Sequence, residues 1–430
     1  MAAEDNTGSF RARPGPLDAA ARAAVHRVLR GLRTGRVELH ERWADEPIVL
    51  GRGAASEPIR VEVRTPDVYT QLARSRSVGL GTTYADGLWE TDDLIGLCRL
   101  GAREVGRGDR IRRRLAPLAR PVQRLRSLPL LNTRRGARRN IAAHYDLGNR
   151  LFELFLDREA MMYSSAVFER PDASLEEAQL ARIERVCRKL ELVGDDHLLE
   201  IGTGWGGMAA FAASRYGCRV TTTTISREQR EYAEARVRAQ GLEDRVTVLG
   251  ADYRALDGRY DKLVSLEMIE AVGWQYFDTF FRRCSELLEP HGLFFLQAIV
   301  IDDRAYEAEK SARSFATELI FPGGCLPSLE IIQRCLARVT DLRSAWLDDI
   351  SSSYVLTLRE WRRRFVAATD RLEELGYDES FRRLWTLWLA LSEAGFAETR
   401  IRDVQLLAAK PGWRGGVAAS VVELPAEAGA

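Results

Sequence analysis

The chain has 430 residues, more than one typical domain, and this length predicts two domains. Its 63 basic and 62 acidic residues leave a formal net charge of +1, so overall charge indicates neither a nucleic-acid-binding protein nor a strongly acidic one. The longest apolar runs, such as Leu293 to Ile301, are far shorter than the roughly 18 residues of a transmembrane helix. We therefore expect a cytoplasmic protein.

The N-terminal part begins with residues 1–16, which are rich in glycine, proline and small residues and are expected to be disordered. They lack the apolar centre of a signal peptide. Residues 17–102 follow as a smaller, mixed N-terminal domain. Within it, Gly79 to Trp89 contains three glycines and is expected to be a loop. The other expected elements are a helix at residues 19–32 and strands at residues 36–39 and 60–63.

An arginine-rich segment, residues 103–139, contains thirteen arginines against two acids and is interrupted by three prolines. The plainest interpretation is a solvated helical linker between two domains. Leucines and isoleucines interleave with the arginines, as in Ile111 to Leu115, and such a pattern suits an anionic membrane surface. No nucleic-acid motif accompanies the charge. The segment therefore predicts peripheral association with the inner face of the membrane and no nucleic-acid partner.

Residues 140–410 form the predicted second domain, in which strands and helices alternate from about Asp195 onward. Alternation of this kind predicts an α/β fold with a doubly wound, mostly parallel sheet that helices cover on both faces. Residues 411–430 are expected to be a disordered tail. The expected strands are residues 197–201, 219–224, 245–249, 262–266 and 293–299, and the expected helices are residues 208–216, 228–240 and 276–288.

A glycine-rich loop follows the first of these strands and reads Glu200-Ile-Gly-Thr-Gly-Trp-Gly-Gly207. Its glycines allow a tight turn and a close approach of the backbone to a ligand. A dinucleotide site would carry an acid about 20 residues further on, and Thr221 to Thr224 stand there instead. One acid, Glu200, precedes the loop, and another, Asp252, follows the third strand. This arrangement favours a class I methyltransferase over an NAD-dependent oxidoreductase.

Seven segments stand in order along the chain: 144–149, 162–166, 200–207, 224–229, 252–254, 270–273 and 321–328. They resemble the motif series of the cyclopropane fatty acid synthase family, which includes mycolic acid cyclopropane synthases, and the resemblance extends over roughly residues 70–410. It implies a class I methyltransferase sheet of seven strands with helical additions. It also implies S-adenosylmethionine as the cofactor and an unsaturated membrane phospholipid as the substrate.

The resemblance assigns the binding residues by position and implies no metal. The cofactor residues are Tyr163 and Ser164 beside the sulfonium, Glu200, Gly202, Gly204, Trp205 and Gly206 at the methionine half, Thr224, Ser226 and Gln229 at the ribose, and Asp252 and Tyr253 at the adenine. The substrate residues are His144, Tyr145 and Phe321.

A bicarbonate ion near the reacting carbons is also implied by the resemblance. The residues implied to hold it are Ser165, Glu270, Gln297, Ile299 and Tyr354. The best-known members have Cys where this chain has Ser165, and His where it has Gln297. A contact through the backbone N–H would make Ser165 an equivalent, and Gln297 keeps an amide donor but cannot carry charge.

A carbon–carbon double bond is a poor nucleophile, so the methyl donor must be held in line with it. Methyl transfer leaves a carbocation, and a base then removes a proton; Glu270 is expected to orient that base. We predict methylation of a cis double bond in a phospholipid acyl chain to form a cyclopropane fatty acid. A methylene-branched product is the nearest alternative. An NAD-dependent oxidoreductase and a non-catalytic lipid-binding protein are the others, and a homodimer is left open.

Overall fold

The computed structural model describes residues 14–53, 57–107 and 148–415, together with positions 132, 133, 136, 137 and 140. The chain divides into two compact units. One unit comprises residues 1–130, 304–323 and 354–401, and the other comprises residues 131–303, 324–353 and 402–430.

The second unit is built on a seven-stranded sheet with the order β10-β11-β9-β8-β5-β6-β7. Strand β5 pairs in parallel with β6 and β8, so Leu199 lies between Thr221 and Leu263, whereas β10 and β11 pair antiparallel. The doubly wound, mostly parallel sheet is confirmed. Its strands are β5 (His197–Ile201), β6 (Arg219–Thr223), β7 (Val246–Leu249), β8 (Tyr260–Leu266), β9 (Leu288–Ile301), β10 (Arg343–Asp349) and β11 (Ile401–Ala409).

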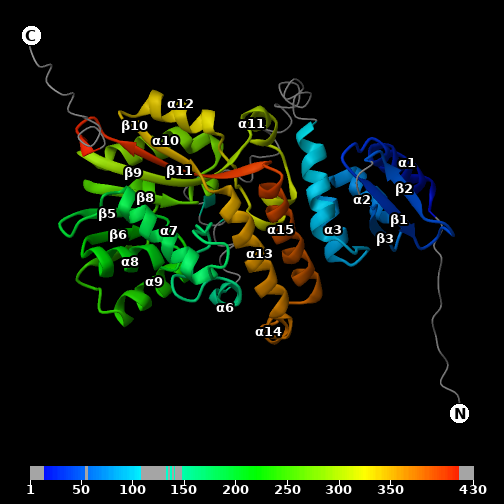
Figure 1. The fold of residues 1–430 in the computed structure, drawn as a ribbon, viewed down its shortest axis with the longest axis horizontal. Helices are drawn as coiled ribbons and strands as arrows, with labels where there is room; N and C mark the ends of the chain where they lie inside the picture. The colour runs from blue at the N-terminus through cyan, green and yellow to red at the C-terminus, as the bar shows by residue number, and fades with distance from the viewer. Residues whose placement is uncertain are drawn as a thin grey trace, which may run out of the picture. The chain divides into compact units, whose positions relative to one another are not determined.

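Helices cover both faces of this sheet, with α7, α8 and α9 on one face and α10 and α12 on the other (Figure 1). Three of them begin after a serine, Ser174, Ser226 or Ser328, whose side chain accepts a hydrogen bond from the backbone of the first turn. The helices of this unit are α6 (Asn149–Glu153), α7 (Leu175–Lys189), α8 (Gly207–Tyr216), α9 (Arg227–Ala239), α10 (Phe277–Glu286) and α12 (Leu329–Val339).

The first unit contains a four-stranded sheet with the order β2-β1-β3-β4, in which only β1 and β3 pair in parallel. Its strands are β1 (Arg36–Glu41), β2 (Ile48–Gly51), β3 (Ile59–Val63) and β4 (Trp89–Thr91). Its helices are α1 (Pro16–Arg30), α2 (Asp67–Ser75), α3 (Ser77–Ala85), α11 (Asp303–Glu309), a π-helix at Ala316–Ile320, most of α13 (Ser351–Ala367), α14 (Thr369–Glu374) and α15 (Glu379–Ala397).

Residues 79–89 are not the predicted loop, because most of them belong to helix α3. The glycines of α3 serve close packing and not a turn. A Cβ atom at Gly79 would lie 2.3 Å from the carbonyl oxygen of Gln71 in α2, and one at Gly81 would lie 2.2 Å from the ring of Phe315. Glycine therefore marks a helix surface against which other elements pack tightly.

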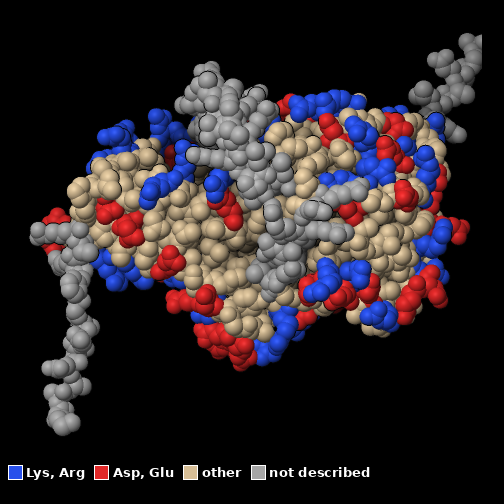
Figure 2. Space-filling model, turned by 180° about the vertical axis from the view of Figure 1, so that it is seen from behind, with Lys and Arg blue, Asp and Glu red and all other residues tan. Residues whose placement is uncertain are grey.

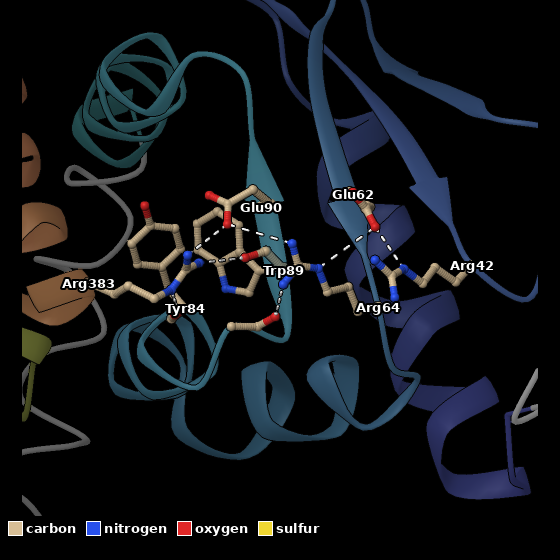
Figure 3. Close-up of polar contacts among 8 residues, drawn as sticks. Arg42, Glu62, Arg64, Tyr84, Trp89, Glu90 and Arg383 are labelled. Carbon is tan, nitrogen blue, oxygen red and sulfur yellow. Dashed lines mark hydrogen bonds and ion pairs between the residues drawn. The ribbon is translucent and has the colours of Figure 1, made fainter. Parts of the chain in front are cut away.

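Helix α15 is joined to this sheet by a chain of ion pairs (Figure 3). Glu90 on β4 lies 3.9 Å from Arg64 and 2.8 Å from Arg383 on α15. The guanidinium of Arg383 also lies 4.3 Å above the ring of Tyr84 and donates to the Tyr84 carbonyl oxygen. The alternating charges run in the order Arg42, Glu62, Arg64, Glu90 and Arg383.

Apolar side chains of α15 share one core cluster with the N-terminal sheet. Leu387, Ala390 and Ala394 are buried together with Val61 and Trp89. This shared core explains why the two compact units do not follow the boundaries expected from the sequence, residues 17–102 and 140–410. None of the helices in the described part of the chain is both long and apolar enough to cross a bilayer.

We expect Gly79→Ala to lower the free energy of unfolding by about 1–3 kcal/mol, because the added methyl group would overlap the backbone of α2. Urea denaturation measures this loss. Gly101→Ala is the matched control, since Gly101 is helical and exposed, and an added methyl group there would have no atom within 4 Å. The free energy of unfolding of the control should equal that of the parent or exceed it by about 0.5–1 kcal/mol. Equal stability of the two variants would contradict the packing role of Gly79.

Candidate active site

A pocket lies at the carboxyl ends of the central strands of the large sheet. Parallel pairing brings these strand ends to one edge, where ligands bind in open α/β sheets. The residues that line the pocket come from the segment after each strand and from one segment before β5. They are residues 161–164, 201–205 after β5, 223–225 and 229 after β6, 251–254 after β7, and 266–268, 271 and 272 after β8, with Asn132 and Ala137.

The glycine-rich loop forms one wall of this pocket. Gly202, Gly204 and Gly206 have φ angles of 106°, 51° and 81°, which side chains disfavour. No atom lies within 4 Å of the place where a Cβ would stand on Gly204, so open space faces the pocket there. Trp205 is buried and donates from Nε1 to Asn149 at 2.8 Å. The loop therefore exposes backbone to a ligand while its tryptophan anchors it.

Glu200 is buried behind the loop and does not line the pocket itself. Thr222 donates to its Oε2 at 2.6 Å. Burial raises the pKa of the Glu200 carboxyl to about 8, and the hydrogen bond and Arg182 offset part of that rise.

Two polar residues after β6 line the pocket in the region predicted for a ribose. Thr224 donates to Oε1 of Gln229 at 2.9 Å, which fixes both side chains. Ser226 does not line the pocket, because its hydroxyl caps α9 by accepting from the Gln229 backbone. Ser226 thus supports the site from behind.

Asp252 and Tyr253 line the part of the pocket after β7. The Asp252 carboxylate accepts hydrogen bonds from the Arg254 guanidinium at 2.8 and 2.6 Å. The Tyr253 hydroxyl is buried without a hydrogen-bond partner among the described residues, and burial raises its pKa above its usual range. A phenol of this kind is available to a ligand.

Tyr163 and Ser164 also line the pocket. The Tyr163 ring packs edge-on against Phe152, with centroids 5.3 Å apart. Gln179 donates to the Ser164 carbonyl at 2.8 Å, whereas the Ser164 hydroxyl is buried and has no partner in the described part of the chain. Open space at Gly204 and the orphaned hydroxyls of Ser164 and Tyr253 fit a polar cofactor bound in the pocket.

A cluster of carboxyl groups adjoins the pocket at Glu267, which is half-buried, and includes the buried Asp403. Glu267 accepts hydrogen bonds on Oε1 from the Ser165 backbone N–H and from Gln297 Nε2, both at 2.7 Å. Gln297 Nε2 also lies 3.0 Å from Oδ2 of Asp403. Burial raises the pKa of Asp403 well above its usual range, and the charge of Glu267 and a hydrogen bond with it add to the rise.

Glu270 belongs to the same cluster but does not line the pocket. The Ile299 backbone N–H donates to its Oε1 at 2.6 Å, and its Oε2 is buried without a partner among the described residues. Burial raises the Glu270 pKa to about 8, and the charge of Glu267 contributes to the rise. The structure thus brings Ser165, Glu270, Gln297 and Ile299 together around Glu267, and their roles stay predictions. Sequence reasoning missed Glu267 and Asp403.

Four other predicted site residues lie either outside the described residues or in the first compact unit. His144 and Tyr145 lie outside the described residues. Phe321 and Tyr354 belong to the first compact unit, where Phe321 packs against Trp388 and Tyr354 stacks on Phe396 at 4.3 Å. Their roles stay predictions.

Comparison with known proteins decides which family carries this pocket. The model of the mycolic acid cyclopropane synthetase family matches residues 132–406. The chain belongs to this family. It is an S-adenosylmethionine-dependent methyltransferase that acts on lipids, and this excludes the oxidoreductase and non-catalytic alternatives.

Three relatives support the family assignment. The chain is 37% identical to the tuberculostearic acid methyltransferase UfaA1 of Mycobacterium tuberculosis, over 89% of this chain and 90% of that protein. It is 35% identical to the cyclopropane-fatty-acyl-phospholipid synthase of Escherichia coli, over 82% of this chain and 87% of that protein. The solved cyclopropane synthase MmaA2 of Mycobacterium tuberculosis superposes with a TM-score of 0.59 at 27% identity, covering 64% of this chain and 98% of that one.

For this family member, we expect Gly204→Val to abolish binding of S-adenosylmethionine, because the branched side chain would fill the pocket and strain a left-handed backbone. Titration calorimetry measures the loss. Gly217→Val is the matched control, since Gly217 has a φ of 73° and open space around it but ends α8 away from the pocket. Unchanged binding by the Gly204 variant, or equal loss in the control, would contradict the assignment.

Glu200→Gln should make the melting temperature of the cofactor-free enzyme less sensitive to alkaline pH. The folded carboxyl has a pKa of about 8 against 4.5 for an unperturbed glutamate, so only the unfolded state loses its proton between these values. Stability therefore falls as pH rises through this window, and glutamine removes this contribution. Melting curves of both proteins from about pH 5 to pH 9 test this. Parallel pH profiles would show that Glu200 is ionised in the fold.

Proposed function

We propose that this enzyme methylates a cis double bond in an unsaturated phospholipid acyl chain and then closes the ring to a cyclopropane. The observation that supports the proposal is the meeting of two features in one pocket. The glycine loop offers a site for the methyl donor, and the Glu267 carboxylate stands in the same pocket lining. A donor site beside a half-buried carboxylate suits electrophilic methylation followed by proton loss.

The proposed division of the cofactor site follows the walls of the pocket. The backbone of the glycine loop, Trp205 and the orphaned Ser164 hydroxyl receive the methionine half. Thr224 and Gln229 receive the ribose, and Tyr253 with the Asp252–Arg254 pair borders the adenine. The Tyr163 ring stands where an aromatic face can stabilise a developing cation, a contribution of about 0.5–2 kcal/mol.

A methylene-branched product is the second candidate. The 37% identical relative is named as a tuberculostearic acid methyltransferase, a name that records methyl transfer and no ring, and it covers more of this chain than the Escherichia coli synthase does. Both products need the same methyl transfer and differ in whether a hydride shift precedes loss of the proton.

The proposed function is tested by incubating the enzyme with S-adenosylmethionine and a monounsaturated phospholipid. Mass spectrometry of the fatty esters detects the added carbon. Because the two products are isomers, gas chromatography before and after mild hydrogenation distinguishes them, since hydrogenation reduces the methylene and spares the ring. A ring-containing ester supports the proposal, and a hydrogenation-sensitive ester supports the second candidate. Absence of any added carbon would refute both.

Glu270→Gln should lower turnover by about 100-fold or more while leaving affinity for S-adenosylmethionine near normal. Glu270 is held by Ile299, lies outside the pocket lining and borders Glu267, so it orients the base without touching the cofactor. Turnover and calorimetric affinity are measured on the same preparation. Full activity of the variant would show that Glu270 is only structural.

Contact with an anionic membrane is proposed for residues 103–139, of which the structure describes only a few. On the face shown in Figure 2, basic and acidic side chains of the described residues are intermixed over much of the surface. The segment contains thirteen arginines, and each basic residue near acidic headgroups contributes roughly 1 kcal/mol to the free energy of membrane binding. Membrane contact would bring the enzyme to its lipid substrate.

Replacing Arg112, Arg113 and Arg114 together by Gln should weaken binding to anionic liposomes and reduce its salt dependence. Cofactor binding should not change. The matched control removes the same charge from α9 with Arg227, Arg230 and Arg238 replaced by Gln. Liposome cosedimentation at two salt concentrations compares them. If both triple variants bind as the parent does, the segment is a linker only.

A further inference from the structure

Of the three acids in the cluster of Glu267, Glu270 and Asp403, Glu267 is the one that lines the pocket. It follows β8 directly. Its backbone has a φ of 50°, a left-handed conformation that residues other than glycine seldom adopt. Unfavourable backbone conformations persist where the surroundings fix them, and they cluster at functional sites.

Two of the five residues that the family resemblance implies for bicarbonate donate hydrogen bonds to Glu267 instead. The Ser165 N–H and the Gln297 side chain both donate to Oε1 of Glu267 at 2.7 Å. A carboxylate and a bicarbonate ion present the same planar pair of oxygens to such donors. Because the protein's own carboxylate already accepts both hydrogen bonds, the residues present do not fit a bound bicarbonate ion.

A buried cation interacts with Glu267. Arg182 on α7 is fully buried; burial lowers its pKa, and the charge of Glu267 offsets part of this fall, ahead of Asp157 and Asp403. Asp403 is also fully buried; burial raises its pKa, and the charge of Glu267 and a hydrogen bond with it add to the rise. The buried cation thus supports the half-buried carboxylate that lines the pocket.

We propose that Glu267 is the base that removes the proton after methyl transfer, in the place of a bound bicarbonate ion. The inference rests on the methyl transfer proposed above. One alkene carbon bonds to the methyl group as the carbon–sulfur bond of the donor breaks, and a cation is left on the other carbon. A C–H bond of the new methyl group then breaks, its electron pair closes the ring, and its proton passes to the Glu267 carboxylate. The proton reaches solvent when the product leaves.

The test uses two substitutions in the full-length enzyme, assayed in carbon-dioxide-free buffer with and without added bicarbonate, formate or acetate. Glu267→Gly suits the left-handed backbone and frees both donors, so an added anion can take the vacated place. Glu267→Gln keeps the volume of the side chain but cannot accept a proton. The parent should be active without bicarbonate and should not respond to it.

Both variants should lose about 100-fold or more in turnover with affinity for S-adenosylmethionine retained. Bicarbonate, formate or acetate should raise the turnover of Glu267→Gly saturably, by about tenfold or more, and leave Glu267→Gln unchanged. Glu191→Gly is the matched control, because Glu191 is exposed, has a φ of 55° and lies outside the pocket. It should behave as the parent.

Three results would overturn the proposal. The first is parent activity that falls when bicarbonate is removed. The second is full activity of the Glu267→Gly variant without an added anion. The third is a Glu267→Gly variant that binds S-adenosylmethionine but whose turnover no added anion raises. A parent that adds no carbon to any monounsaturated phospholipid would refute the proposed function as well, so the two failures are distinguishable.

Discussion

Parallel pairing of β5 with β6 and β8 is the constraint on which the site depends. It fixes Ile201, Thr223 and Leu266, the last residues of these strands, at one edge of the sheet. The glycine loop, Thr224 and Glu267 follow those strand ends and therefore converge on one pocket. The strands are buried between helices on both faces of the sheet, and this burial fixes the strand ends. The residues that follow these ends, such as Gly204 and Glu267, can therefore be held at positive φ angles.

Several acids are buried beside the pocket at these strand ends. Removing a carboxylate from water is costly unless a partner or a proton compensates. Here burial raises the pKa of Glu200 and of Glu270 to about 8 and that of Asp403 well above its usual range, which lowers the cost of burying these acids. Arg182 is a buried basic group that offsets part of these rises for Glu200 and Asp403.

The sequence predicted the five parallel strands of the central sheet because short strand-like runs alternate there with helical segments, and the predicted strand 197–201 matches β5 residue for residue. It did not predict β10, whose residues are mostly exposed and alternate only weakly, so no periodic signal marks them. The prediction of a loop at residues 79–89 was wrong, because it assigned Gly79 and Gly81 to a turn whereas both lie in helix α3. Their actual role, close contact with Gln71 and Phe315, depends on partners that local sequence does not reveal.

The candidate site could be predicted where a single motif supplies it and not where distant segments meet. The hydrogen bonds of Glu267 involve Ser165, Gln297 and, through Gln297, Asp403, which are far apart in sequence.

The same hydrogen bonds relate the two departures from the family pattern, Ser165 and Gln297, to Glu267. Ser165 contributes a backbone N–H, so its side chain is free to vary, and its hydroxyl turns to the Ala166 carbonyl. Gln297 donates to two carboxyl groups while its Oε1 accepts from Gln405 at 3.0 Å. A histidine ring has one nitrogen on each side and cannot serve both acids from a single edge. Gln297 therefore suits the proposed role of Glu267 through its side chain, whereas position 165 contributes only its backbone N–H.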